Sequence, residues 1–157
     1  MPRHPYKKRT VKPDPIYNSH EVAKLINYII IDGKKSVAKA VVYKSMEELK
    51  KENPDPVKVL HKAISNVAPT VEVKPRRLGG ASYLVPTEVR RERRLYLALN
   101  WIIEAAKAKP NKEFRSFEAK LTSEILEASK SQGASVNKRL QAEKLAEANK
   151  AFAHLKW

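Results

Sequence analysis

The sequence contains no cysteine, and this absence excludes several kinds of chemistry. Without thiols the chain forms no disulfide, no cysteine nucleophile and no cysteine-based zinc site. No apolar run is as long as a membrane span, and the N-terminus has no apolar block of the kind found in signal peptides. We therefore expect a protein of the cytosol, or of an equivalent internal compartment, without a membrane partner.

The residue patterns of enzymes are also missing. The chain has only four glycines, and the pair Gly79-Gly80 lacks the strand-to-helix context and the lysine-serine or lysine-threonine pair of a phosphate-binding loop. No serine or carboxylate stands at triad or metal-site spacing from a histidine. The histidines themselves are scattered, at His4, His20, His61 and His154. The sequence therefore predicts no catalytic activity, no metal site and no cofactor.

Positive charge is what the chain has in excess. Its 157 residues include 32 lysines and arginines against 17 aspartates and glutamates, so the formal net charge is +15. Such a charge opposes compactness in isolation and favours a polyanionic partner, most simply a nucleic acid. The length suits one domain with its own core, so we predict a single nucleic-acid-binding domain over residues 1–157.

Apolar residues recur at helical spacing in six segments, which predicts a mostly α protein, a bundle of about six helices. Ser19 is expected to cap the first helix, and Asp55 with Pro56 to begin the third. Ser135 is expected to cap the sixth helix, which with the tail forms the C-terminal segment 135–157.

Two further side chains have predicted positions. His61 shares the apolar face of the third helix and is expected in the core, since no second histidine stands at metal spacing. Glu124 and the other acids of the fifth helix are expected on the helix surface, which makes that helix the least basic element.

Residues 71–88 interrupt the helical pattern. β-Branched and charged residues alternate there, and the alternation breaks at Gly79-Gly80, which is typical of a β-hairpin. Pro75 and Pro86 cannot donate to a central ladder, so neither strand lies inside a larger sheet. Two strands alone are marginal in water unless they pack on another element. The sequence therefore predicts an extended two-stranded hairpin between the third and fourth helices.

Four groups of basic residues are candidate nucleic-acid contacts. They are Arg3, Lys7, Lys8, Arg9 and Lys12 in a basic N-terminal arm (residues 1–17), Lys34 and Lys35 between the first two helices, Arg76 and Arg77 in the hairpin, and Arg91, Arg93 and Arg94 at the start of the fourth helix. The helix dipole disfavours cations at a helix N-terminus. A phosphate backbone across that turn would offset the cost.

Three stretches together resemble one family. The first is 32–36 leading to 41–43, the second is 66–73 followed by 76–80 and 83–86, and the third is 146–154. In this order and spacing they are similar to small-subunit ribosomal protein seven of the bacterial and organellar type, and the resemblance covers essentially the whole chain.

The resemblance implies a structural constituent of the small ribosomal subunit that binds the 3′ major domain of 16S-type rRNA and nucleates assembly of the head. It implies that the four basic groups contact rRNA. It also implies a place at the exit-site cleft, where the residues near exit-site tRNA and mRNA would be Arg77, Leu78, Gly79, Gly80, Ala81, Tyr83 and Lys150.

The resemblance further implies that neighbouring head and platform proteins contact the last helix. The location would be the ribosome of the cytoplasm, or the plastid stroma if the gene is plastid-encoded.

The residues alone leave one alternative open, a histone-like architectural protein that binds duplex DNA with a basic β-arm. Such arms insert a proline or another apolar side chain between base pairs, whereas the tip here is Gly79-Gly80. No repeat or coiled-coil seam suggests an obligate homo-oligomer. Basic groups on several elements suit a folded RNA, which proteins recognise by shape, phosphates and 2′-hydroxyls, better than one straight groove.

Overall fold

A computed structural model describes residues 10–155 of the chain. Within this range there are six α-helices, one 3-10 helix and two strands. In chain order they are α1 (His20–Ile29), α2 (Lys35–Glu52), α3 (Pro56–Val67), β1 (Val71–Leu78), β2 (Ala81–Glu88), α4 (Arg91–Ala108), α5 (Phe117–Ser129), α6 (Ala134–Ala148) and η1 (Lys150–Leu155). The predicted fold class, mostly helical with a hairpin between the third and fourth helices, is confirmed.

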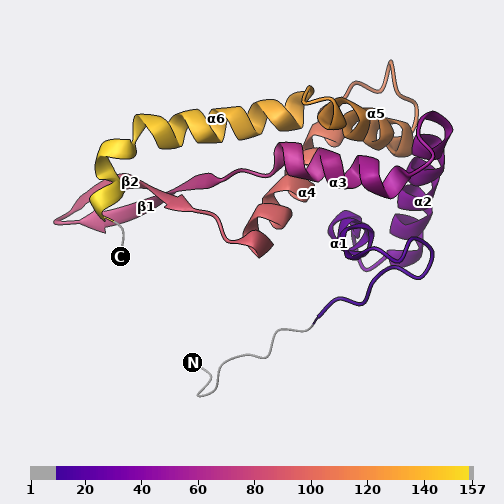
Figure 1. Cartoon of the computed structure of the whole chain (residues 1–157), viewed down its shortest axis with the longest axis horizontal. Coiled ribbons are helices and arrows are strands. Elements are labelled where there is room, and N and C mark those ends of the chain that lie inside the picture. The colour runs from indigo at the N-terminus through magenta and orange to yellow at the C-terminus, as the bar shows by residue number, and fades with distance from the viewer. Residues whose placement is uncertain (1–9, 156–157) are drawn as a thin grey trace.

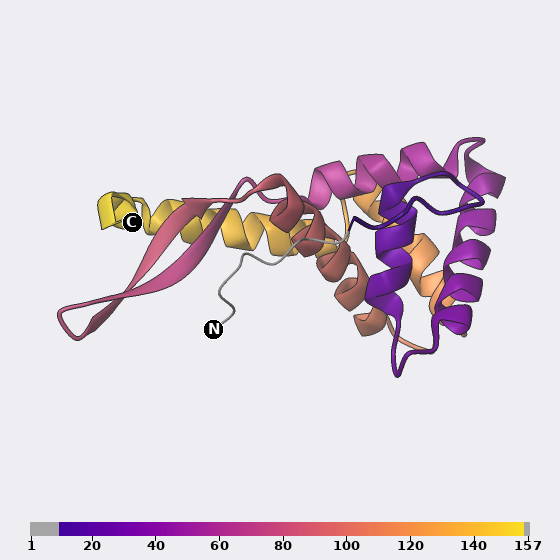
Figure 2. The ribbon, with the colours of Figure 1, turned by 90° about the horizontal axis from the view of Figure 1, so that it is seen from below.

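The molecule is elongated (Figure 1). Helices α1 to α5 pack together at one end, and the ribbon formed by β1 and β2 extends away from them. Helix α6 leaves the helical body and runs beside the ribbon, packing on β1, while η1 packs on β2. Figure 2 shows from below that the ribbon twists as it extends. The hairpin is therefore supported along one side, as a two-stranded sheet requires.

The core lies in the helical body and is centred on α5, which packs against α2, α3 and α4. Its fully buried side chains come from all five helices, among them Leu25, Met46, Leu60, Leu99, Ile102, Leu121 and Ile125. Helix α5 carries a single basic residue, Lys120, and that side chain is itself buried.

The helix starts agree only in part with prediction. Ser19 precedes α1, and its Oγ accepts a hydrogen bond from the Val22 amide at 3.5 Å. Asp55 precedes α3, but its carboxylate pairs with Lys58 and caps no backbone amide. Helix α6 begins one residue before Ser135, after Gly133 at φ 97°, so the predicted serine cap is wrong.

Two predicted positions are also wrong. The His61 side chain is 70% exposed and its Nε2 lies 3.8 Å from the Glu21 carboxylate. It follows Leu60 directly, so it lies at the edge of the apolar stripe and faces solvent. Glu124 was predicted on the helix surface but is fully buried. Its burial is possible because Ser135 and Lys109, from neighbouring elements, bind its carboxylate.

Candidate nucleic-acid interface

The structure places most of the predicted cations at the surface. Within residues 10–155, the side chains of Lys12, Lys34, Lys35, Arg77, Arg91 and Arg93 are exposed, and those of Arg76 and Arg94 are partly buried. The other four candidates, Arg3, Lys7, Lys8 and Arg9, lie outside the described residues.

The first cluster of cations lines a groove of about 340 Å³ between the end of the N-terminal arm, α1 and α2. Lys12 from the arm and Lys35 and Lys39 from α2 line it together. Lys12 and Lys35 are predicted contacts, whereas Lys39 was not predicted from the sequence. The i, i+4 spacing of Lys35 and Lys39 was the available signal, since residues four apart share a helix face. We call these three residues the arm lysines.

The arm is fixed beside this groove by a buried carboxylate. Asp14 is only 4% exposed, and it accepts hydrogen bonds from the amides of Ile16 and Tyr17 at 3.1 and 3.2 Å. It also accepts one from the Tyr43 hydroxyl of α2 at 2.7 Å. Burial, followed by the hydrogen bond to Asp14, raises the pKa of Tyr43 to about 12. Because Asp14 is bonded both to its own loop and to Tyr43 of α2, it keeps Lys12, two residues before it, close to α2.

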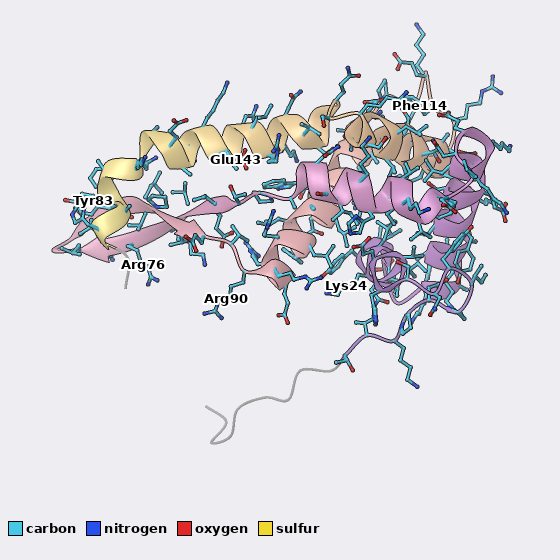
Figure 3. All side chains as sticks on the ribbon, in the orientation of Figure 1. Lys24, Arg76, Tyr83, Arg90, Phe114 and Glu143 are labelled. Atoms are coloured by element: carbon cyan, nitrogen blue, oxygen red, sulfur yellow. The ribbon has the colours of Figure 1, made fainter. Side chains whose placement is uncertain are left out.

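A second groove, of about 640 Å³, lies between α1, α3 and the start of α4. Lys24, Arg91 and Arg94 line it, and Figure 3 shows Lys24 on the side of α1 toward α4. Glu21 and Glu92 line the same groove, so its net positive charge is smaller than that of the groove with the arm lysines. Lys24 was missed because a lone lysine on an amphipathic helix carries no distinctive signal.

The arginines at the start of α4 differ in whether their side chains already bind another residue of the chain. Arg93 donates from Nε to the Glu72 carboxylate of β1 at 3.2 Å and lies over the Tyr96 ring at 5.1 Å. Burial alone would raise the pKa of Glu72, but hydrogen bonds from Lys74 and Arg93 lower it. The ribbon therefore supplies a carboxylate that partly offsets the unfavourable helix-dipole term. Arg91 is exposed in the same turn.

The two arginines of the ribbon point to opposite faces. Arg76 is opposite Tyr83 and Arg77 is opposite Ser82 in the antiparallel register, and successive strand residues alternate between faces. Tyr83 packs on Phe152 of η1 with ring centroids 5.3 Å apart. Arg76 consequently shares its face with the contact to η1, whereas Arg77 lies on the other, exposed face.

The turn between the strands is narrow. Gly79 and Gly80 have φ values of 55° and 92°, a left-handed conformation that glycine adopts at little cost. Leu78 beside them is 44% exposed, so an apolar side chain does stand next to the tip. Lys150 lies elsewhere: it lines a groove with Glu88 at the base of the ribbon, so the structure does not gather all the predicted tRNA-side residues.

Figure 3 shows how the C-terminal segment meets the ribbon. Tyr83 lies between the ribbon and η1, and Glu143 lies on the side of α6 toward the ribbon. The Glu143 carboxylate accepts hydrogen bonds from the amide and hydroxyl of Thr70 at 3.5 and 3.3 Å.

None of the helices within residues 10–155 is both long enough and apolar enough to cross a membrane.

Known proteins are similar in sequence to this chain over all or nearly all of its length. Residues 1–150 match the family described as Ribosomal protein S7p/S5e. The small ribosomal subunit protein uS7 of Caldanaerobacter subterraneus subsp. tengcongensis is 49% identical over 159 residues, and that of Caldicellulosiruptor bescii is 46% identical over 159 residues; both alignments cover all of each chain. The uS7 protein of Thermosipho africanus is 50% identical over 150 residues, which is 95% of each chain. The chain therefore belongs to the ribosomal protein S7p/S5e family, whose members are structural, non-enzymatic proteins of the small ribosomal subunit.

Proposed function

We propose that the chain binds the 3′ major domain of 16S-type rRNA and nucleates assembly of the subunit head. One observation carries this proposal: cations from the arm, α1, α2 and α4 line two grooves on neighbouring faces of α1. Segments distant in sequence thus present positive charge over a curved surface. Such a surface suits a folded RNA, whose phosphates and 2′-hydroxyls are reached from several directions.

The arm lysines are the main phosphate contact in this proposal. Asp14 is the acid beside them, and its carboxylate is already bound by Tyr43 and two amides. In the second groove Glu21 and Glu92 repel phosphate and reduce the attraction of Lys24 and Arg91. The sequence before Thr10 contains four more of the predicted contacts, Arg3, Lys7, Lys8 and Arg9.

We propose further that the ribbon tip lies near exit-site tRNA and outgoing mRNA. Gly79-Gly80 makes the tip slim, and the exposed Arg77 stands close to it. The Tyr83 ring is held by Phe152, so its task in this proposal is to position the ribbon. Neighbouring head and platform proteins then contact α6 and η1.

The test is the salt dependence of binding to an RNA of the 3′ major domain. Each phosphate contact contributes roughly 0.7–0.9 to the slope of log K against log salt concentration. Lys35→Ala with Lys39→Ala should lower affinity and reduce the slope by about one to two units. Lys112→Ala is the matched control, because Lys112 is an exposed loop lysine that lines neither groove. A double variant with the slope of the control would contradict the proposal.

Two further measurements separate the parts of the proposal. Deletion of residues 78–81 should leave rRNA affinity unchanged and weaken exit-site tRNA binding by assembled subunits. Loss of rRNA binding by this deletion would make the tip an rRNA anchor. Duplex DNA at matched salt is the comparison ligand, and equal affinity for it would favour an architectural DNA-binding role.

A further inference from the structure

An apolar hollow of about 250 Å³ lies at the end of the helical body, and none of its lining residues lines either cationic groove. The connection between α1 and α2, the last turn of α4 and the start of α5 form it. Figure 2 shows the α1–α2 connection at the lower edge of the helical body, far from the ribbon tip. Its apolar lining residues are Ile29, Ile31, Val37, Ala38, Val41 and Phe117.

The walls of this hollow expose large apolar side chains. Ile31 is 62% exposed and Val37 is 58% exposed, and both line the hollow. Other exposed large apolar residues of the described chain, such as Leu78 on the ribbon and Leu140 on α6, belong to different elements. A cluster of this kind on a strongly charged protein marks an interaction surface better than single exposed residues do.

Two lysines stand at the rim. Lys34 and Lys107 line the hollow, whereas Lys35, the neighbour of Lys34 in sequence, lines the groove of the arm lysines. Lys34 and Lys35, which the sequence predicts as one site, thus lie on two different surfaces. A ligand for the hollow must combine an apolar group with negative charge beside it.

We propose that this hollow docks an acidic segment of a neighbouring protein, which inserts one aromatic or branched aliphatic side chain between Ile31 and Val37. Its carboxylates then meet Lys34 and Lys107. An apolar anchor in a pocket with charged groups around it is a common arrangement at the centre of protein interfaces. Such rim charges fix the partner and its register more than they raise affinity.

A nucleobase fits the hollow less well. RNA-binding surfaces hold unstacked bases on aromatic or arginine faces and satisfy their polar edges with hydrogen bonds. Phe117 is the single aromatic residue of this lining, and it is half-buried against the core. The aliphatic walls provide no donors or acceptors for a base edge. The chemistry of the hollow therefore favours a protein side chain.

The test uses small subunits reconstituted from rRNA and purified subunit proteins. A photoreactive phenylalanine derivative replaces Val37, and the same derivative at Ile16, which is also exposed but outside the hollow, is the matched control. We expect a crosslink from position 37 to a polypeptide, at a peptide with an apolar residue flanked by acids. The double reversal Lys34→Glu with Lys107→Glu should then lower that crosslink by about tenfold.

Retention of the chain on rRNA is measured in the same samples, so failure of the rRNA proposal and failure of this one are distinguishable. A crosslink from position 37 to RNA would overturn the docking proposal. So would a yield no higher than from position 16, or a crosslinked peptide without acidic residues. An undiminished crosslink in the double reversal would overturn it as well.

Discussion

The substitution Ser135→Ala tests how α6 is joined to the helical body. Ser135 is buried, and its Oγ donates to the Glu124 carboxylate at 2.7 Å while its amide donates to the same oxygen at 3.0 Å. Glu124 is fully buried and its other oxygen lies 3.4 Å from the Lys109 ammonium. These contacts bring the start of α6, the middle of α5 and the end of α4 together.

The magnitude follows from these contacts. A hydrogen bond to a charged group contributes about 1.5–3 kcal/mol, and the lower half of that range applies because the carboxylate keeps the backbone amide of Ser135. Alanine recovers about 0.5 kcal/mol through its helix propensity. The net loss in the free energy of unfolding is therefore about 1–1.5 kcal/mol, which corresponds to a Tm lower by about 3–5 °C for a chain of this size.

Thermal and urea unfolding of the full chain, followed by far-UV circular dichroism, measures this change. Ser36→Ala is the matched control, because Ser36 is also the second residue of an α-helix but is exposed. It should leave stability unchanged or raise it by about 0.5 kcal/mol. Ser135→Ala is therefore expected to destabilise the chain, and Ser36→Ala is not. If Ser135→Ala is no more destabilising than Ser36→Ala, the buried contact to Glu124 contributes nothing and the reasoning is refuted.

Three further predictions concern the arm, the ribbon and α4. Because the pKa of Tyr43 is raised to about 12 in the folded chain, the free energy of unfolding should fall as pH rises from about 10 to about 12. Tyr43→Phe should remove one tyrosinate transition near pH 12, measured by absorbance at about 295 nm. Phe152→Ala should increase amide hydrogen exchange around Tyr83 without affecting the helical body, because it removes their ring contact. Glu72→Gln releases Arg93, so the salt slope of rRNA binding should steepen by up to about one unit; an unchanged slope would place Arg93 outside the interface.

Much of the fold could be predicted because its signals are local. The apolar stripe of α1 and the proline at the start of α3 depend on residues within one or two turns. The ribbon is marked by Gly79-Gly80 and by the prolines of its strands. These patterns define an element before any tertiary contact exists, so the order of helices and hairpin follows from the sequence.

The predictions from sequence were wrong or incomplete where contacts between segments distant in sequence determine the position of a side chain. The burial of Glu124 depends on Ser135 and Lys109, which belong to other elements. The partial neutralisation of Arg93 depends on Glu72, twenty-one residues away. The opposite directions of Arg76 and Arg77 do follow from strand alternation, but which of the two faces solvent depends on where η1 packs. No local pattern contains that information.

Helix α6 determines where the ribbon tip lies relative to the cationic grooves. The two strands alone would be too weak to hold a fixed direction, but α6 and the following η1 together contact other elements at three places. Ser135 joins its start to the helical body, Glu143 binds Thr70 at the base of the ribbon, and Phe152 of the following η1 packs on Tyr83 near the tip. These contacts join the surface proposed to bind rRNA to the tip proposed to lie near tRNA, so we expect a neighbour bound to α6 to affect the tip more than the grooves on α1.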